Sequence, residues 1–280
     1  MPLRKRLVED ASSLRMQTFD SVPDFLFDQG KIESNTNTNI NQRTTIVTLD
    51  RTQKNSVFTS PLLRWRRREE RDYLFNNLKQ IRISKKDIHN GAIPMLENRD
   101  DLVLFRKLNQ ISLKISDSVV KDNGRVLFIP KAIRYFITAV PFDLERPNTI
   151  QLHVSEENYH LVHSIVNSNL FYWWWRVNGN GFQVEMKDIL SFPLLPLTKD
   201  KAREFSKKLD QSVDECRVFK HNAGKQIPNI NYNYKQELLQ EIDVELLKTL
   251  DLVPHERIFY CKTNSLFGNM DALRGYKVER

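Results

Sequence analysis

Residues 165–196 read IVNSNLFYWWWRVNGNGFQVEMKDILSFPLLP and hold three of the four tryptophans of the chain. Just before and into this stretch, apolar residues recur at helical spacing from Leu161 to Val166, which predicts a helix with one buried face. The run from Phe171 to Trp175 is too bulky to be buried on every side, so we expect some of these rings to face a partner or a rim.

The second half of the stretch predicts a turn and a strand. Residues 178–181, Asn-Gly-Asn-Gly, tolerate positive φ at several positions and favour a tight reversal. Residues 182–186 then alternate as a strand would. Pro193 and Pro196 take the chain out of regular pairing, because proline lacks a backbone N–H.

This combination of motifs resembles the C-terminal specificity domain of the TaqI-like adenine-specific DNA methyltransferases. The resemblance rests on the helix end NSNLFYWWW, the Gly-rich turn after it and the exit KDILSFPLLP, and it covers about residues 120–215. Such enzymes belong to restriction-modification and phage-defence systems. The resemblance therefore implies sequence-specific recognition of double-stranded DNA by a target recognition domain.

The resemblance also implies a base-stacking aromatic residue, because an adenine flipped out of the duplex loses its stacking neighbours. In the segment FLFDQGK, Phe27 is the position that matches best. The alternative interpretation is that Phe27 packs under a sheet.

Two parts of the family's catalytic machinery are missing from the sequence. None of the eight glycines forms a strand–loop–helix fingerprint for S-adenosylmethionine, and no Asn-Pro-Pro-Tyr or Asp-Pro-Pro-Tyr segment occurs. We therefore expect this chain to bind no cofactor and to be non-catalytic alone. It would act as a fragment or subunit beside a methyltransferase catalytic domain that uses S-adenosylmethionine.

The net charge of +8 is unevenly distributed over the 280 residues. Residues 1–140 carry 25 Lys and Arg against 16 Asp and Glu, whereas residues 141–280 carry 18 against 19. A basic surplus in one half is typical of a face that binds a polyanion, although basic proteins are common for other reasons.

The densest basic run is PLLRWRRREERD, residues 61–72. Its arginines match phosphate oxygens and its tryptophan can stack on a base. Equally, the arginines can pair with neighbouring carboxylates along a solvated helix. The DNA-binding candidates in this run are Arg64, Trp65, Arg66, Arg67 and Arg68.

Three segments, residues 125–130, 133–140 and 149–155, are rich in β-forming residues and predict a small mixed sheet. Polar groups beside these strands and the turn are the candidates for reading bases, since Arg contacts guanine and Asn contacts adenine in the major groove. They are Lys131, Arg134, Tyr135, Arg176, Asn178 and Asn180.

A different function class is a metal-dependent DNA nuclease. Glu185 and Lys187 have the spacing that places a carboxylate and an ammonium on one face of a strand, and Asp143 is the only nearby candidate for the upstream Asp that such a site also needs. His160 and His163 are more typical of a helix surface than of a metal site. A third possibility is a freestanding DNA-specificity subunit without enzymatic activity.

The whole chain is thus expected to be α/β, with four parts. Residues 1–60 would be the end of a methyltransferase catalytic domain, with a possible helix at residues 11–16 and a strand at residues 44–49, and residues 61–120 a basic connector that is mostly helical from Tyr73. Residues 121–215 would form the specificity domain and residues 216–280 a helical tail. Apolar residues at helical spacing from Ala202 to Cys216 and from Leu238 to Leu250 predict two amphipathic helices. No apolar run is long enough to span a membrane, and with two cysteines no disulfide framework or zinc site is expected, which fits a reducing cytoplasm.

Overall fold

The computed structural model describes residues 6, 7, 9, 13–19, 44–50, 56–63, 78–89, 92–132, 136–222 and 225–253. It divides the chain into two compact units, Met1–Val103 and Leu104–Arg280, and each unit is described by itself. Both helices and strands are present, so the predicted α/β class is confirmed. The finer division into four parts stays a prediction.

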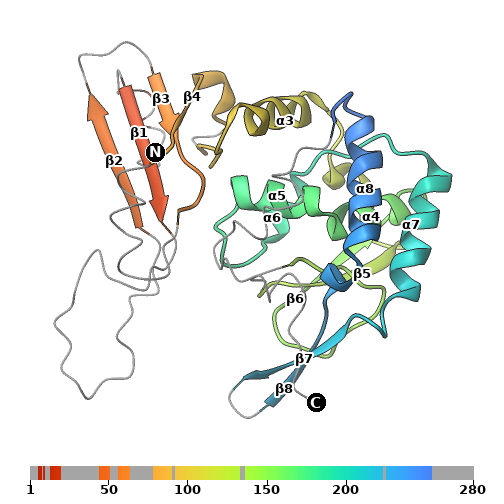
Figure 1. Cartoon of the computed structure of the whole chain (residues 1–280). Helices are drawn as coiled ribbons and strands as arrows, with labels where there is room; N and C mark the ends of the chain where they lie inside the picture. Colours follow the sequence, from red (N-terminus) through yellow and green to blue (C-terminus); the bar gives the residue numbers. More distant parts are fainter. Residues whose placement is uncertain are drawn as a thin grey trace, which may run out of the picture. The chain divides into compact units, whose positions relative to one another are not determined.

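The first unit contains a four-stranded sheet with the order β2-β1-β3-β4 (Figure 1). β1 pairs antiparallel with β2 and parallel with β3, and β3 pairs antiparallel with β4, so the sheet is mixed. The strands are β1 (Ser13–Phe19), β2 (Thr44–Asp50), β3 (Ser56–Thr59) and β4 (Ile81–Ile83).

The register of this sheet creates one apolar row across its strands. Leu14 lies opposite Val57 on one side and Leu49 on the other. Leu14 and Val57 are buried, whereas Leu49 on the edge strand β2 is half exposed. The predicted strand at residues 44–49 is confirmed, but the predicted helix at residues 11–16 is wrong, because Leu14 and Met16 alternate with the exposed Arg15.

After β4 comes a short 3-10 turn, η1 (Lys85–Asp87), and then helix α3 (Arg99–Gln110), inside which the two units meet in sequence. Asn98 and Asp101 cap α3, since the Asn98 Oδ1 accepts from the N–H of Asp101. The prediction of mostly helical structure from Tyr73 is therefore right for α3 and wrong for the described residues before it, which form β4, η1 and irregular segments.

The second unit contains the antiparallel pair β5 (Arg125–Pro130) and β6 (Thr149–Val154). Ile150, Leu152 and Val154 point to the core, as predicted. The expected strand at residues 133–140 is not formed in its described part, where only Val140 bridges to Phe128. The small sheet of this unit is thus a two-stranded antiparallel ladder rather than a mixed sheet.

Helices pack around this ladder. In Figure 1, α4, α7 and α8 lie side by side, and α5 contacts both α4 and α8. The core consists of aliphatic side chains together with an unusual number of large rings. The helices are α4 (Tyr159–Asn167), α5 (Asn169–Asn178), α6 (Met186–Leu190), α7 (Lys199–Gln211) and α8 (Gln236–Lys248), with a 3-10 turn η2 (Ile115–Ser118) before β5.

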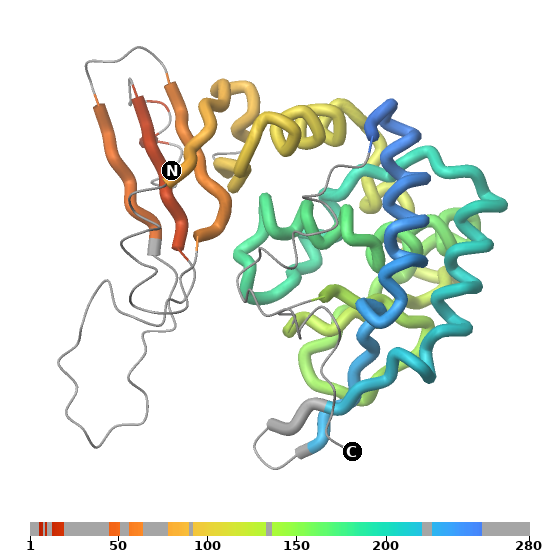
Figure 2. Tube along the Cα trace, viewed as in Figure 1, coloured from red at the N-terminus to blue at the C-terminus, as the bar shows by residue number. Residues whose placement is uncertain are grey.

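Between α7 and α8 the chain forms a second hairpin, β7 (Arg217–Asn222) and β8 (Lys225–Ile230), followed by a 3-10 turn η3 (Tyr232–Lys235). Figure 2 traces this excursion, in cyan to blue, from the end of α7 to the start of α8. The two amphipathic helices α7 and α8 are as predicted. The hairpin between them was not predicted.

Candidate nucleic-acid interface

The aromatic run lies inside a helix that is buried on every side. α5 spans Asn169–Asn178, and its rings from Phe171 to Trp175 are each at most 4 % exposed. Trp174 stacks on Phe105 with 5.9 Å between the ring centroids and meets Phe192 edge to face. The expectation that some of these rings face a partner is therefore wrong, because a helix that is apolar all round is a core helix.

The N-terminus of α5 is held by a buried carboxylate far away in sequence. The two oxygens of Asp243, in α8, accept from the side-chain amide of Asn169 at 2.8 Å and from the N–H of Leu170 at 2.9 Å. Ser168 caps the same end by accepting from the N–H of Phe171. A negative charge at a helix N-terminus is favourable, so these contacts stabilise the start of α5 at Asn169.

At the C-terminal end of α5 the chain turns over the indole of Trp175. The N–H of Gly179 donates to the carbonyl of Trp175 at 2.7 Å. A Cβ at position 179 would lie 2.6 Å from that oxygen and 2.8 Å from the indole nitrogen. Only glycine fits such a close approach without a shift of the backbone.

The next residues form a turn held by side-chain hydrogen bonds rather than a strand. The Oδ1 of Asn180 accepts from the N–H groups of Phe182 and Gln183 at 2.8 and 2.9 Å. Gly181 has φ 62°, the left-handed conformation that glycine adopts readily. The predicted reversal is confirmed, whereas the predicted strand at residues 182–186 is wrong: Gln183 makes an isolated bridge to Ala132 and α6 starts at Met186.

This turn, residues 178–187, is named here the NG loop. It is tied to the body of the unit at two points. The indole N–H of Trp175 donates to the carbonyl of Gln183 at 3.1 Å, and the N–H of Val184 donates to the carbonyl of Lys131 at 3.0 Å. The NG loop is therefore anchored to the unit at both of these points, and Lys131 lies beside it.

Glu185 and Lys187 do not have the geometry that the nuclease interpretation requires. Glu185 is the N-cap of α6 and Lys187 lies within that helix, so the two side chains are not alternate residues of a strand. The carboxylate of Glu185 instead lies 3.6 Å from the ammonium of Lys131. Asp143 lies in a loop. Among the residues that the structure describes, no group of three His, Cys, Asp or Glu side chains is arranged to hold a metal ion.

The predicted DNA contacts fall into three sets. Asn178 and Asn180 are exposed on the NG loop, and Lys131 is half buried beside it. Arg176 is buried, only 9 % exposed, so its guanidinium does not border an open groove as expected. The remaining candidates lie outside the described residues: Phe27, Arg64, Trp65, Arg66, Arg67, Arg68, Arg134 and Tyr135.

The sequence did not predict the polar cluster formed by His160, His163 and Ser206. Ser206, in α7, lies between two histidines of α4, with its Oγ 2.9 Å from the Nδ1 of His160 and 2.9 Å from the Nδ1 of His163. The Nε2 of His163 lies 3.1 Å from the carbonyl oxygen of Ala139, and the Nε2 of His160 lies 3.4 Å from the guanidinium of Arg125. His163 is fully buried, so the expectation of a helix surface is wrong for it.

The donor and acceptor in each of these hydrogen bonds follow from the outer partner of each imidazole, which is the Ala139 carbonyl for His163 and the Arg125 guanidinium for His160. A carbonyl only accepts, so the Nε2 of His163 carries the proton and its neutral Nδ1 accepts from Ser206. The guanidinium of Arg125 only donates, so the Nε2 of His160 accepts and its Nδ1 donates to Ser206. Both imidazoles are therefore neutral. Burial lowers the pKa of His163 to about 4 and, with the nearby Arg125, also lowers the pKa of His160.

This cluster joins α4, α7, β5 and the segment before Val140, and Ser206 is completely buried. Its role is to position these elements. Sequence spacing alone gave no signal for it, because Ser206 comes from a helix 43 residues after His163.

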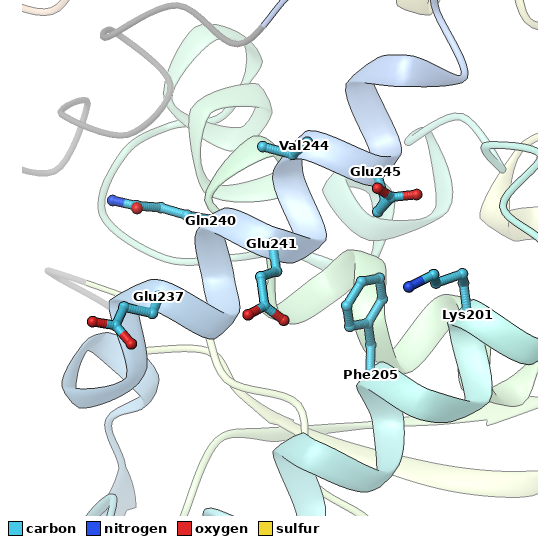
Figure 3. A pocket seen from close by; sticks show the side chains of 7 residues that line it. All are labelled: Lys201, Phe205, Glu237, Gln240, Glu241, Val244 and Glu245. Atoms are coloured by element: carbon cyan, nitrogen blue, oxygen red, sulfur yellow. The ribbon is translucent and has the colours of Figure 1, made fainter.

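A shallow hollow of about 530 Å³ lies between α7 and α8 (Figure 3). Three carboxylates of α8, those of Glu237, Glu241 and Glu245, line it opposite Lys201 and Phe205 of α7. Its excess of negative charge disfavours a phosphate backbone. Of the two features of this unit, the NG loop is therefore the better candidate for contact with nucleic acid.

No family model, curated protein or solved structure matches this chain. Within the described residues, no helix combines the length and apolar character needed to cross a bilayer.

Proposed function

We propose that this chain is a sequence-specific DNA-recognition module that works with the catalytic domain of an adenine-specific, S-adenosylmethionine-dependent methyltransferase of a restriction-modification or phage-defence system. The observation that carries the proposal is the NG loop. It is a turn held by hydrogen bonds with two exposed asparagine side chains; Lys187 is its last residue and Lys131 lies beside it.

The chemistry of the NG loop suits a base edge. An asparagine amide can both donate to and accept from adenine, and lysine binds phosphate or guanine. Asn180 uses its amide oxygen inside the turn, whereas the amide of Asn178 donates to the carbonyl of Trp174 and keeps its oxygen available from an exposed position. In this proposal Asn178 reads the base and Asn180 shapes the loop.

The methyl donor belongs to the partner in this proposal. The three glycines in the described part of the chain, Gly124, Gly179 and Gly181, do not connect a strand to a following helix. A donor-binding loop needs that connection, because its backbone must approach the ligand closely at a helix N-terminus.

The test is binding of the full chain to a randomised pool of DNA duplexes at low salt, followed by titration with salt. We expect enrichment of one sequence and an affinity that falls steeply with salt. Lys187→Gln is expected to reduce the slope of log affinity against log salt by about 1, and Asn178→Ala to relax the choice of one base pair at a cost of about 1–3 kcal/mol. Lys248→Gln, an exposed lysine of α8, is the matched control and should leave both unchanged.

Two outcomes would end the proposal: no affinity for any duplex at low ionic strength, or binding of S-adenosylmethionine by the chain alone. Methyl transfer that appears only after addition of a catalytic polypeptide would support the split enzyme. DNA binding without such a partner would indicate a freestanding specificity subunit. Magnesium-dependent nicking that Lys187→Ala abolishes would instead favour the nuclease.

A further inference from the structure

The NG loop carries a large apolar side chain, Phe182, that is mostly exposed to solvent. Phe182 is 64 % exposed, more than Phe219 at 44 % or Tyr234 at 37 %. A single exposed apolar side chain is ordinary on a protein surface. What distinguishes Phe182 is the rigidity of the backbone that presents it.

The backbone on both sides of Phe182 is fixed by hydrogen bonds. Its own N–H and that of Gln183 donate to Asn180, and the carbonyl of Gln183 accepts from the Trp175 indole. Two residues later, Val184 is fully buried and bonded to Lys131. The ring is thus presented at a fixed place, so little backbone entropy is lost when it contacts a partner.

The surroundings of Phe182 indicate which partner fits. Polar and basic side chains, those of Asn178, Asn180, Lys131 and Lys187, belong to the NG loop or lie directly beside it. The loop's carboxylate, Glu185, lies 3.6 Å from the Lys131 ammonium, so within the described residues the exposed Lys187 is the unpaired charge of this set. Met186, 37 % exposed at the start of α6, is a second apolar side chain in the same loop. In DNA, flat apolar base pairs alternate with phosphate anions. The Phe182 ring could contact a base, and the neighbouring amide and ammonium groups could contact base edges and phosphates.

We propose that Phe182 is a wedge that enters a base-pair step and unstacks it when the module binds its DNA target. This inference rests on the proposed function, because it assigns a role to a residue of the same loop. Apolar side chains at such steps kink the duplex and separate neighbouring bases, which lowers the cost of extruding one of them.

The experiment uses the full chain and the duplex enriched from the randomised pool, with 2-aminopurine placed at each position in turn. Binding of the wild-type chain should raise the fluorescence at one step, because unstacked 2-aminopurine is no longer quenched by its neighbours. Phe182→Ala should abolish this rise and weaken binding about tenfold, while the salt slope stays unchanged. Phe182→Leu, which keeps an apolar side chain, should retain part of the signal.

Phe219→Ala is the matched control, since it removes an exposed phenyl ring from β7 in the same unit. It should bind and unstack like the wild type. If Phe182→Ala keeps the wild-type fluorescence rise and affinity, the wedge is refuted while the module still binds DNA. If it loses only the association with a catalytic polypeptide, Phe182 belongs to a protein interface and the inference is wrong. Failure of the wild-type chain to bind any duplex would instead remove the proposed function itself.

Discussion

At the scale of single residues, Asp243 shows how a distant carboxylate determines where a helix begins. It accepts hydrogen bonds from Asn169 and Leu170 at the N-terminus of α5 and is completely buried. Without it, two buried donors lose their partner, and such donors are costly because no water replaces the acceptor.

We therefore expect Asp243→Ala to lower the free energy of unfolding by about 2–3 kcal/mol, as measured by urea denaturation. Glu241→Ala removes an exposed carboxylate from the same helix and should cost less than about 0.5 kcal/mol. Equal effects of the two substitutions would contradict the role given to Asp243.

Burial of His163 leads us to expect that the free energy of unfolding depends on pH. Its folded pKa of about 4 lies below the ordinary value of 6.5, so between these values the unfolded chain binds a proton that the folded chain does not. Stability should therefore fall as the pH is lowered from 6.5 towards 4 and gain nothing further from this group above 6.5. The total loss from His163 is about 3 kcal/mol at most.

The measurement is the free energy of unfolding of wild type and His163→Gln between these pH values. Glutamine can donate to the carbonyl of Ala139 but does not titrate, so the variant should have a shallower pH dependence by about one proton. A variant slope identical to that of the wild type would show that His163 is not the titrating group.

At the scale of elements, the link from α5 to the NG loop depends on the close approach of Gly179 to Trp175. Gly179→Ala would place a methyl group against the carbonyl and indole of Trp175. We expect a loss of about 1–3 kcal/mol and a weaker near-ultraviolet circular dichroism signal of the tryptophans. Asn178→Ala, one residue earlier and exposed, should change neither by a comparable amount.

Some helices and turns were predicted from the sequence, whereas two of the strand-containing segments were not. α7 and α8 followed from their apolar periodicity, and the turn after Asn178 followed from its glycines, because both signals are local. The segment that forms β1 was predicted to be helical. Its sequence nevertheless alternates the apolar Leu14 and Met16 with the charged Arg15, and this period of two is typical of a strand. The β7–β8 hairpin was missed because its strands, although as long as β5 and β6, carry fewer apolar side chains and so give a weaker strand signal.

At the scale of the whole molecule, the aromatic core belongs to the second unit. Phe105 of α3 stacks on Trp174, so the C-terminal half of α3 is part of that core. We expect a fragment of residues 95–280, which keeps the Asn98–Asp101 cap, to unfold cooperatively with the tryptophan signals of the full chain.

A fragment of residues 113–280 is the matched comparison. It lacks Phe105 and leaves Trp174 without its stacking partner, so it should be less stable and show an altered near-ultraviolet spectrum. Thermal unfolding followed by circular dichroism distinguishes the two fragments. If residues 95–280 fail to fold, the second unit is not autonomous.

The uneven charge gives a further prediction at this scale. Replacing Arg64, Arg66, Arg67 and Arg68 together by glutamine should reduce the salt slope of DNA binding by about 3.6, if each arginine contacts a phosphate. Glutamine at Lys199, Lys201, Lys207 and Lys208 of α7 removes the same number of charges and serves as the control. A slope that changes equally in both variants would mean that net charge alone matters and not the basic run.

The sequence by itself determined the α/β class, the two tail helices, the strand at residues 44–50, the β5–β6 strands and the reversal after α5. These features are encoded by residues close to one another in the chain, through periodicity and turn chemistry. The tertiary structure decided that Trp173, Trp174 and Trp175 are core residues, that Arg176 is buried, that Glu185 is the N-cap residue of a helix and that His163 bonds to Ser206. Burial and hydrogen-bond partners depend on which distant segments pack together, and no local pattern specifies that.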